Sequence, residues 1–351
     1  MNPLHATLAE LIDTPSPTGQ EGRLCTSIAE RLMPTWQLDG VVRVGNSLVV
    51  GTRTGRPVVS LYGHIDTVPE QGNGAARVED GVMYGLGSTD MKAGLAVMLH
   101  VLEDADVRIG PYDVVGVFYD KEEGPADENG LEEVLERVPW LDSSALAIVM
   151  EPTANKLELG CNGAINADVV FHGKAAHSAR PWLGENAITK AGAWLAELHS
   201  MPPAAVMLHG LEYREVFSVT RAAGGIANNV LPASFTLNLN HRFPPIYSLE
   251  EAEVRLRDVA APADDVLIKD RAPAGTIPEG NPLLDALEAA LDTELAAKQA
   301  WTDVARLTAR GIAAVNYGPG LPELAHQSGE YVPLGNLDES FARLKGFLTA
   351  G

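Results

Sequence analysis

The sequence has 351 residues, which is longer than a single core usually supports, so two domains are expected. Hydrophobic residues make up 46% and charged residues 21%, the proportions of an ordinary globular protein. The formal net charge of −21 would repel polyanions over most of the surface, which argues against nucleic-acid binding. No stretch approaches the roughly 20 apolar residues that a membrane span needs, so no membrane partner is expected.

The N-terminus and the cysteines predict the cellular compartment. Residues 1–14 lack a cationic start followed by an apolar core, so we expect no secretory signal. Cys25 and Cys161 are the only cysteines and have no metal-type spacing, so we expect two reduced thiols. Together these features predict a cytoplasmic protein.

Helices and strands alternate along the first part of the chain. Apolar residues recur at helical spacing in some segments, and short β-branched runs lie between them. The predicted helices are Leu4–Ile12, Glu21–Leu32, Met91–Leu102 and Gly130–Arg137, and the predicted strands are Ser47–Gly51, Pro57–Tyr62, Tyr112–Phe118 and Ala145–Met150. This order predicts an α/β domain with a largely parallel central sheet and helices on both faces. In such sheets ligands bind where the strands end in loops.

The middle of the chain has a different pattern. Apolar and polar residues alternate with period two at Ala164–Phe171, Val216–Ala222 and Ser234–Arg242, as expected for strands. Helices are expected at Asn186–His199 and Leu249–Val259. This order suits a small α+β layer.

The tail of the chain returns to the α/β pattern from Asn281 onward. It contains a helix, a short apolar strand at Ile312–Asn316 and a closing helix near Leu337–Thr349. We therefore expect a catalytic domain formed by residues 1–163 and 272–351, with a smaller domain of residues 164–271 inserted into it.

Candidate metal ligands follow the ends of predicted strands. His64 comes just after the strand Pro57–Tyr62, and Asp66 is placed to fix the tautomer of its imidazole through a hydrogen bond. Asp90 precedes the helix that begins at Met91, where a carboxylate near the positive helix end could bridge two cations. A structural role for His64 and Asp66, and helix capping by Asp90, are the alternatives.

Further reactive side chains follow two other strands and a late loop. Glu122 and Glu123 come after the strand that ends at Phe118, so one could bind metal while the other moves protons. A solvated charge cluster is the ordinary alternative for such a pair. Glu151 follows another apolar strand, and His326 lies near the end of the chain.

Five of these side chains could together hold two metal ions. A lone zinc usually takes three or four protein ligands, whereas five ligands with one bridging aspartate fit two ions about 3.5–4 Å apart. Imidazole and carboxylate ligands suit two Zn²⁺ per subunit, with Co²⁺ or Mn²⁺ as substitutes. The five ligands are His64, Asp90, Glu123, Glu151 and His326.

In combination the motifs resemble the M20 family of di-zinc aminoacylases and peptidases. The resemblance rests on Gly63–Asp66, Gly87–Lys92, Glu122–Glu123, Glu151–Thr153 and His326. It extends from residue 15 to about residue 330, which is nearly the whole chain. It implies a catalytic α/β domain interrupted by a small dimerisation domain, in agreement with the predicted layout.

The resemblance also implies how the ligands are shared between two ions. Asp90 would bridge the ions. His64 and Glu151 would complete the protein ligands of one ion, and Glu123 and His326 those of the other.

Four more residues acquire roles from the same resemblance. Glu122 would be the catalytic base, and Asp66 the hydrogen-bonding partner of the His64 ligand. In the inserted domain, His177 would reach the active site of the partner subunit in a homodimer and stabilise the oxyanion. Asn229 matches the asparagine of a substrate-contacting Asn-Val-x-Pro turn.

Within this family the chain is most similar to the actinobacterial-type succinyl-diaminopimelate desuccinylases. The runs Phe118–Glu123, Ala176–Trp182 and Tyr317–Gly320 carry this closer resemblance. It implies hydrolysis of N-succinyl-LL-2,6-diaminopimelate to succinate and LL-2,6-diaminopimelate, a step of lysine and diaminopimelate biosynthesis. The alternatives are an acetylornithine deacetylase, another N-acyl-amino-acid deacylase or a dipeptidase of the same family, and a non-catalytic ligand-binding relative.

An anionic N-acyl amino acid requires cationic groups inside an acidic protein. Arg180 and Arg242 are the candidates, because a guanidinium binds a carboxylate through two parallel hydrogen bonds. Surface solvation is the alternative for each. Gly318, in the run Tyr317–Gly320, is a further candidate substrate contact.

Overall fold

The computed structural model describes residues 2–350, and the chain forms two compact units. Unit 1 consists of Met1–Leu159, Ile277–Ala296 and Leu307–Gly351. Unit 2 consists of Gly160–Thr276 and Ala297–Arg306. In the described part of the chain no helix is long and apolar enough to cross a membrane.

Unit 1 is built on an eight-stranded sheet with the order β1-β2-β6-β3-β7-β15-β8-β14. The inner strands β6, β3, β7 and β15 pair in parallel, whereas β1, β2 and β8 join them in antiparallel fashion. The strands are β1 (Val41–Val44), β2 (Ser47–Val50), β3 (Val58–His64), β6 (Asp113–Tyr119), β7 (Leu146–Val149), β8 (Leu157–Leu159), β14 (Leu295–Ala297) and β15 (Ala314–Asn316). This confirms the predicted α/β class with a largely parallel central sheet.

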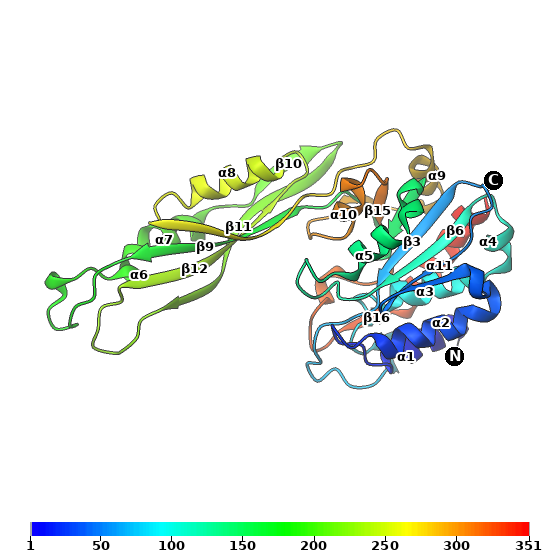
Figure 1. Cartoon of the computed structure of the whole chain (residues 1–351), viewed down its shortest axis with the longest axis horizontal. Coiled ribbons are helices and arrows are strands. Elements are labelled where there is room, and N and C mark those ends of the chain that lie inside the picture. Colours follow the sequence, from blue (N-terminus) through cyan, green and yellow to red (C-terminus); the bar gives the residue numbers. More distant parts are fainter. Residues whose placement is uncertain (1, 351) are drawn as a thin grey trace. The chain divides into compact units, whose positions relative to one another are not determined.

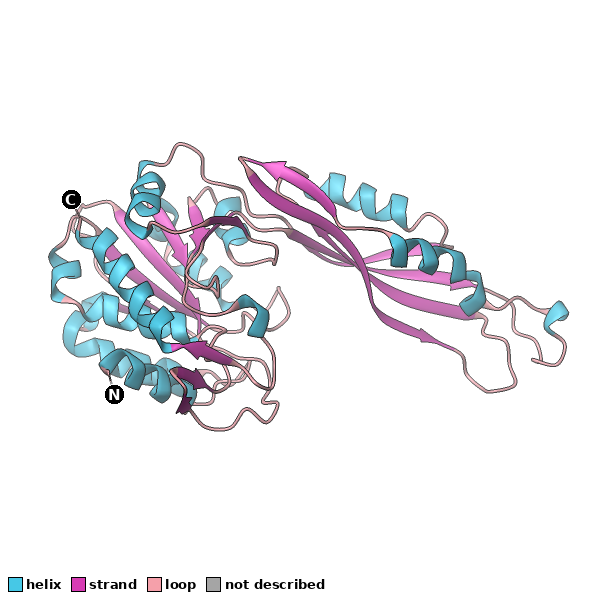
Figure 2. Ribbon diagram, turned by 180° about the vertical axis from the view of Figure 1, so that it is seen from behind, coloured by secondary structure: helices cyan, strands magenta, loops and turns pink. Residues whose placement is uncertain are grey.

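Helices cover the faces of this sheet, so its central strands are buried along their whole length (Figures 1 and 2). α3 packs against β3 and β6 and is itself enclosed by α1, α2 and α11, which explains why its residues are almost all buried. α5 lies against β1, β2 and β6. The helices of unit 1 are α1 (Pro3–Ile12), α2 (Gly22–Trp36), α3 (Lys92–Glu103), α4 (Ala105–Ile109), α5 (Gly130–Arg137), α9 (Pro282–Leu291) and α11 (Leu334–Thr349), with a further helix, α10 (Val304–Ala309), at the boundary between the units.

A small three-stranded sheet joins two distant parts of unit 1. It has the order β16-β5-β4 and consists of β4 (Arg77–Glu79), β5 (Val82–Tyr84) and β16 (Tyr331–Pro333). The antiparallel pairing of Tyr331 with Tyr84 places the loop before β16 beside the loop after β5. Both loops carry predicted metal ligands.

Unit 2 is an α+β layer around its own core. Its antiparallel sheet has the order β10-β11-β12-β9-β13, and the side chains of β12 alternate between buried and partly exposed. The core contains Phe171, Trp194, Leu239 and Phe243. The elements are β9 (Gly163–His172), β10 (Ala204–Leu208), β11 (Leu211–Gly224), β12 (Ser234–Phe243), β13 (Asp265–Ala272), α6 (Ala187–Lys190), α7 (Gly192–Ser200) and α8 (Leu249–Val259).

The chain enters and leaves unit 2 at one place. Cys161 and Gly275 form an antiparallel bridge, in which each backbone N–H donates to the carbonyl of the other residue over 3.1 and 3.0 Å. Lys298 also lies here, because its carbonyl accepts a hydrogen bond from the amide of Asn162. This contact explains why Ala297–Arg306 joins unit 2, although the sequence pattern had placed it in the other domain.

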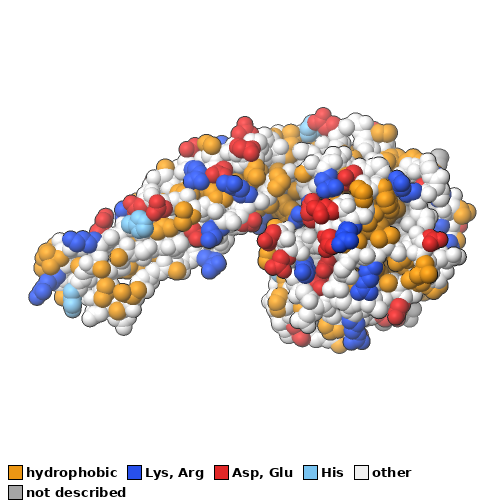
Figure 3. All heavy atoms as spheres, in the orientation of Figure 1, with side chains coloured by type: hydrophobic (Ala, Val, Ile, Leu, Met, Phe, Trp, Pro, Cys, Tyr) orange, Lys and Arg blue, Asp and Glu red, His pale blue; other side chains and the backbone are white. Residues whose placement is uncertain are grey.

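The structure contains elements that the sequence patterns did not indicate. β10 and β13 are the edge strands of unit 2, and most of their side chains are exposed, so they lack the clear alternation of the inner strands. The helix expected over Asn186–His199 is divided at Ala191 into α6 and α7. On the face drawn in Figure 3, acidic and basic side chains are interspersed within each unit.

Candidate metal centre

Predicted site residues follow three neighbouring strands at one edge of the central sheet. β3 ends at His64, β6 is followed by Glu122 and Glu123, and β7 is followed by Glu151. Because β6, β3 and β7 are adjacent and parallel, their carboxyl ends meet at the same edge. The topology therefore gathers side chains from three separate parts of the sequence.

The remaining two ligands come from the loops that the small sheet brings together. Asp90 lies between β5 and α3, and His326 lies in the loop before β16. The pairing of β5 with β16 aligns these loops, which are far apart in the sequence.

His64 is the most buried of the predicted ligands, with 1% of its side chain exposed. Its Nδ1 lies 3.1 Å from the backbone oxygen of Asp66, an acceptor that fixes the proton on Nδ1. Its Nε2 faces the carboxylates of Asp90, at 3.2 Å, and Glu151, at 3.8 Å. Burial opposes the charged form of His64, but hydrogen bonds to Asp66 and Asp90 outweigh burial and raise its pKa. With Nδ1 held by the Asp66 carbonyl, Nε2 is the nitrogen that would bind a metal ion.

Asp90 lies between the two histidines. Its Oδ1 faces His64 Nε2, whereas its Oδ2 lies 3.4 Å from His326 Nε2, which also contacts Glu123 Oε1 at 2.9 Å. Three groups of described residues could hold a metal ion, and in each the ligand atoms lie within 4.8 Å of one another. The first two, His64 with Asp90 and Glu151 and Asp90 with Glu123 and His326, consist of predicted ligands and share Asp90. The third consists of His64, Glu122 and Glu123.

The acids of the cluster alter the protonation of its histidines. Hydrogen bonds to Asp90 and Glu123 raise the pKa of His326 to about 10. Burial disfavours the charged form of Asp90, but its contacts with His326 and His64 outweigh burial and lower its pKa. The cluster therefore favours positive charge at the positions that face its carboxylates.

The donor set fits two divalent ions of zinc type. Each group offers one imidazole nitrogen and two carboxylates, the ligand classes that Zn²⁺ takes in catalytic sites. The shared Asp90 supplies one oxygen to each side, which is the arrangement that a bridging carboxylate requires.

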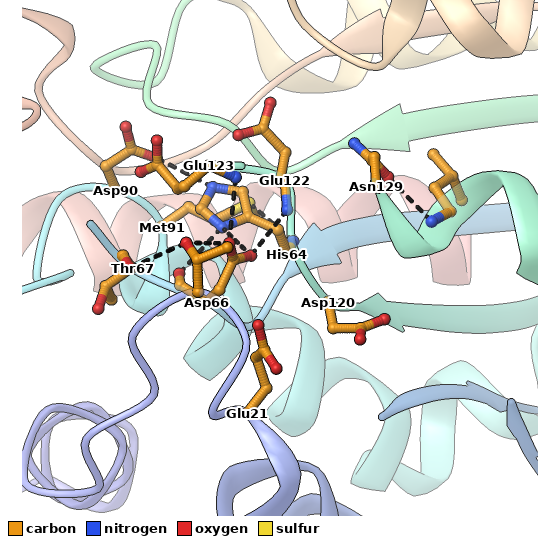
Figure 4. A network of polar contacts seen from close by, with 12 residues as sticks. Glu21, His64, Asp66, Thr67, Asp90, Met91, Asp120, Glu122, Glu123 and Asn129 are labelled. Atoms are coloured by element: carbon orange, nitrogen blue, oxygen red, sulfur yellow. Dashed lines mark hydrogen bonds and ion pairs between the residues drawn. The ribbon is translucent and has the colours of Figure 1, made fainter. Parts of the chain in front are cut away.

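Asp66 connects His64 to the glutamate pair. Its Oδ1 accepts from the amide of Glu122 over 3.0 Å, and its Oδ2 accepts from the amide of Glu123 over 3.1 Å and from the Thr18 hydroxyl over 2.9 Å (Figure 4). Burial opposes ionisation, but the hydrogen bonds from His64 and both amides outweigh it and lower the pKa of Asp66. One buried carboxylate thus fixes the backbone of both glutamates, whereas the backbone carbonyl of Asp66 holds His64. The Asp66 carboxylate lies farther from this histidine, with Oδ1 3.5 Å from Nδ1.

Glu122 is held by its backbone, and its carboxylate points away from Asp66 (Figure 4). One of its carboxylate oxygens lies within 4.8 Å of donor atoms of His64 and Glu123. Asp120, in contrast, is turned away from the cluster and accepts a hydrogen bond from Ser47. Glu122 thus lies beside the two groups that share Asp90 and itself belongs to a third group, with His64 and Glu123.

Two buried charged residues near the cluster had no predicted role. Glu330 accepts hydrogen bonds from three backbone amides of the Asp90 loop. Lys92 donates through Nζ to the carbonyls of Leu11 and Thr14, and burial lowers its pKa to about 8. Hydrogen bonds to backbone atoms leave no pattern in a sequence. The available signal was position: Glu330 lies four residues after His326, and Lys92 lies two residues after Asp90.

Gly318 is a packing position beside Glu151. An added Cβ would lie 2.4 Å from the carbonyl oxygen of Met150 and 2.5 Å from that of Glu151. Its amide donates to the Thr153 hydroxyl, and its carbonyl accepts from Thr153 and Asn155. The N–H and the C=O of Gly318 are thus both hydrogen-bonded within the protein. This backbone offers a substrate no free donor or acceptor, so a direct hydrogen bond from Gly318 to substrate is not favoured.

The predicted residues of unit 2 occupy two regions of that unit. His177, Arg180 and Asn229 are exposed on neighbouring loops, where Ser178 donates to the carbonyl of Asn229 and His177 forms a bridge with Val230. Arg242 lies near the far end of β12 from these loops. It is partly buried and donates through Nε to Asn240 over 3.1 Å. Within unit 2, Arg242 therefore does not belong to the same cluster as His177.

Comparison with known proteins identifies the family. A model described as peptidase family M20/M25/M40 matches residues 60–350. The Mycobacterium tuberculosis protein assigned as succinyl-diaminopimelate desuccinylase DapE is 40% identical over 350 residues, which covers 99% of this chain and 98% of that protein. The succinyl-diaminopimelate desuccinylase of Corynebacterium glutamicum is 38% identical over 350 residues, covering 97% and 94%. The solved structure of aminopeptidase PepT from Bacillus cereus has a TM-score of 0.80 at 19% identity, covers 99% of this chain and 97% of its own, and shows a likeness of fold alone. The chain belongs to peptidase family M20/M25/M40.

Proposed function

We propose that this protein hydrolyses the amide bond of N-succinyl-LL-2,6-diaminopimelate to give succinate and LL-2,6-diaminopimelate, a step of lysine and diaminopimelate biosynthesis. The observation that carries the chemistry is the pair of donor groups that share Asp90, with Glu122 beside them. The choice of substrate is supported by the identity with two desuccinylases over nearly the full length of all three chains.

Two Zn²⁺ ions per subunit are the proposed cofactors, with Co²⁺ or Mn²⁺ as substitutes. His64 and Glu151 would hold one ion, Glu123 and His326 the other, and Asp90 both. When bound, such ions polarise a carbonyl group and lower the pKa of a coordinated water from 15.7 towards about 7.

Glu122 is the proposed proton carrier. Its carboxylate takes a proton as the water oxygen joins the succinyl carbonyl carbon, and it returns a proton to the amide nitrogen as the C–N bond breaks. The products are a carboxylate and a free amine, so one water molecule is consumed and Glu122 ends in its starting state. Asp66 keeps the Glu122 backbone in place through the amide hydrogen bond.

The substrate carries three carboxylates and one ammonium group, so its binding requires cations. Arg180 and Arg242 are the proposed carboxylate partners. His177 is the proposed donor to the developing oxyanion and would act from the partner subunit of a homodimer, with Asn229 on the adjoining loop as a substrate contact. Gly318 would shape the wall beside Glu151. We place this reaction in the cytoplasm.

A substrate panel tests the proposal. Initial rates would be measured on N-succinyl-LL-2,6-diaminopimelate, acetylornithine and a dipeptide, each with added Zn²⁺ and with a chelator. We expect turnover of the succinylated compound, restored by Zn²⁺ after chelation, and a loss of several orders of magnitude in Glu122→Ala with metal content retained. No cleavage of the succinylated compound would refute the substrate. Near-normal turnover by Glu122→Ala would remove Glu122 from its role.

A separate measurement tests the subunit arrangement. Light scattering after size-exclusion chromatography should give a dimer, and a mixture of His177→Ala with Glu122→Ala chains should regain part of the activity that each variant lacks alone. A fully active monomer would contradict the role of His177 in a partner subunit.

A further inference from the structure

The loop that carries His326 ends in an acidic residue, Glu330, which is 2% exposed. Glu330 belongs to none of the groups of described residues that could hold a metal. Its carboxylate instead accepts hydrogen bonds from backbone. Oε2 accepts from the amide of Gly87 over 2.9 Å, and Oε1 accepts from the amides of Thr89, over 2.7 Å, and Asp90, over 3.0 Å. A further bond joins the amide of Gly85 to the carbonyl of Glu330.

The three amides belong to the loop that leads into α3. They precede α3, whose N-cap residue is Met91, and no side chain caps the helix locally. Gly87, with a φ of 77°, turns the backbone within the same loop. Glu330 accepts from these loop amides and not from those of the first helical turn, so it anchors the loop that leads into α3 rather than capping the helix.

Burying the Glu330 carboxylate has a desolvation cost, which is offset by hydrogen bonds from three backbone amides. An apolar residue of similar volume would avoid this cost but would leave three buried amides without an acceptor. A carboxylate, with two oxygens that only accept, satisfies all three.

We propose that Glu330 is a positioning residue that holds the Gly87–Asp90 loop so that the two oxygens of Asp90 face His64 and His326, and that it thereby sets the affinity of the two-ion site. This inference rests on the proposed metal site, but not on the identity of the substrate. The loop before β16 therefore carries the proposed ligand His326 and, through Glu330 at its end, positions the proposed bridging ligand Asp90.

Zn²⁺ titration of the metal-free full-length protein tests this role without an activity assay. Calorimetry would compare the wild type with Glu330→Gln and Glu330→Ala. The glutamine variant has the same size, but its carboxamide has one accepting oxygen and turns an NH₂ group toward the amide donors. We expect Zn²⁺ affinity at one or both ions to fall about 10–100-fold, the usual effect of losing a group that orients a ligand.

Glu323→Gln is the matched control, because Glu323 is an exposed acid on the same segment and its substitution removes the same charge. It should leave Zn²⁺ affinity unchanged. Thermal unfolding of each metal-free variant separates a positioning role from a purely structural one, which would lower the melting temperature without changing Zn²⁺ affinity.

The result that overturns the inference is an affinity for both ions within about fivefold of wild type in Glu330→Gln. If Glu330→Ala does not fold, the glutamine variant alone decides. A wild-type protein that takes up no Zn²⁺ would instead refute the proposed metal site, so the two failures are distinguishable.

Discussion

Replacing Gly320 by alanine should impair the proposed metal centre, although Gly320 is not itself a metal ligand. Gly320 lies between two loops that carry metal ligands. A Cβ at this position would be 2.1 Å from the backbone oxygen of Thr89 and 2.8 Å from Cβ of Pro152. Thr89 precedes Asp90 and Pro152 follows Glu151, so the added methyl group would push against both ligand loops.

The size of the effect follows from the overlap. Ordinary contacts of a Cβ begin at 3.4 Å, and the atom in the way belongs to backbone that cannot rotate aside. The loops must therefore separate by about 1 Å, a displacement that costs roughly 100-fold in rate when it moves catalytic groups. Overpacking of this kind should also lower stability by about 1–3 kcal/mol.

The assay would compare kcat on the succinylated substrate, Zn²⁺ stoichiometry and urea unfolding for Gly320→Ala and a control. Gly335→Ala is a suitable control, because Gly335 lies in α11 and an added Cβ there meets nothing within 4 Å. It should be neutral or slightly stabilising. Wild-type kcat and full metal content in Gly320→Ala would refute the reasoning.

Two further predictions concern the metal ions and acid stability. Graded chelation should remove the ion on the His326 side first, because the His326 side chain is 51% exposed whereas that of His64 is 1% exposed. Metal content measured against chelator concentration should therefore fall in two steps. Simultaneous loss of both ions would contradict this order. In unit 2, burial disfavours the ionised form of Glu215, but hydrogen bonds from Arg255 and His241 lower its pKa from 4.5 to about 2. Ionised Glu215 therefore stabilises the folded protein above about pH 4.5, and this stability is lost as the pH falls toward 2. Glu215→Gln should therefore lower the free energy of unfolding at pH 7 by roughly 3 kcal/mol and much less at pH 2, as measured by urea unfolding; an equal loss at both pH values would exclude the ionic contribution.

Four of the five proposed metal ligands follow a recognisable strand or precede a recognisable helix, which is why the sequence pointed to them, whereas His326 lies in a late loop. His64 and Glu151 come after apolar runs that can only be buried strands, and parallel pairing then brings their loops to one edge. The resemblance to the M20 family, confirmed by the comparisons, supplied the division of ligands between two ions. The facing oxygens of Asp90 agree with that division in the structure.

The supporting residues could not be predicted in the same way. Glu330 and Gly320 act on backbone atoms, and which backbone lies beside them depends on tertiary packing rather than on sequence spacing. β13 was not predicted, because most side chains of this edge strand are exposed and such a strand needs no alternation of apolar and polar residues. Arg242 was expected at the end of a strand, and it lies in β12, but its hydrogen bond to Asn240 appears only in the structure.

The bridge between Cys161 and Gly275 has a consequence for the order of assembly. β7 pairs with β15 in parallel, although all of β9 to β13 lies between these strands in the chain. An unfolded connection of that length would have to be closed at a large cost in chain entropy. Once unit 2 has folded around its own core and joined its two ends, the connection behaves as a shorter one, which lowers the cost by roughly 1 kcal/mol on the logarithmic dependence of loop closure on length. His326 follows β15, so the second half of the metal centre is delivered most readily to a chain whose inserted unit has already closed.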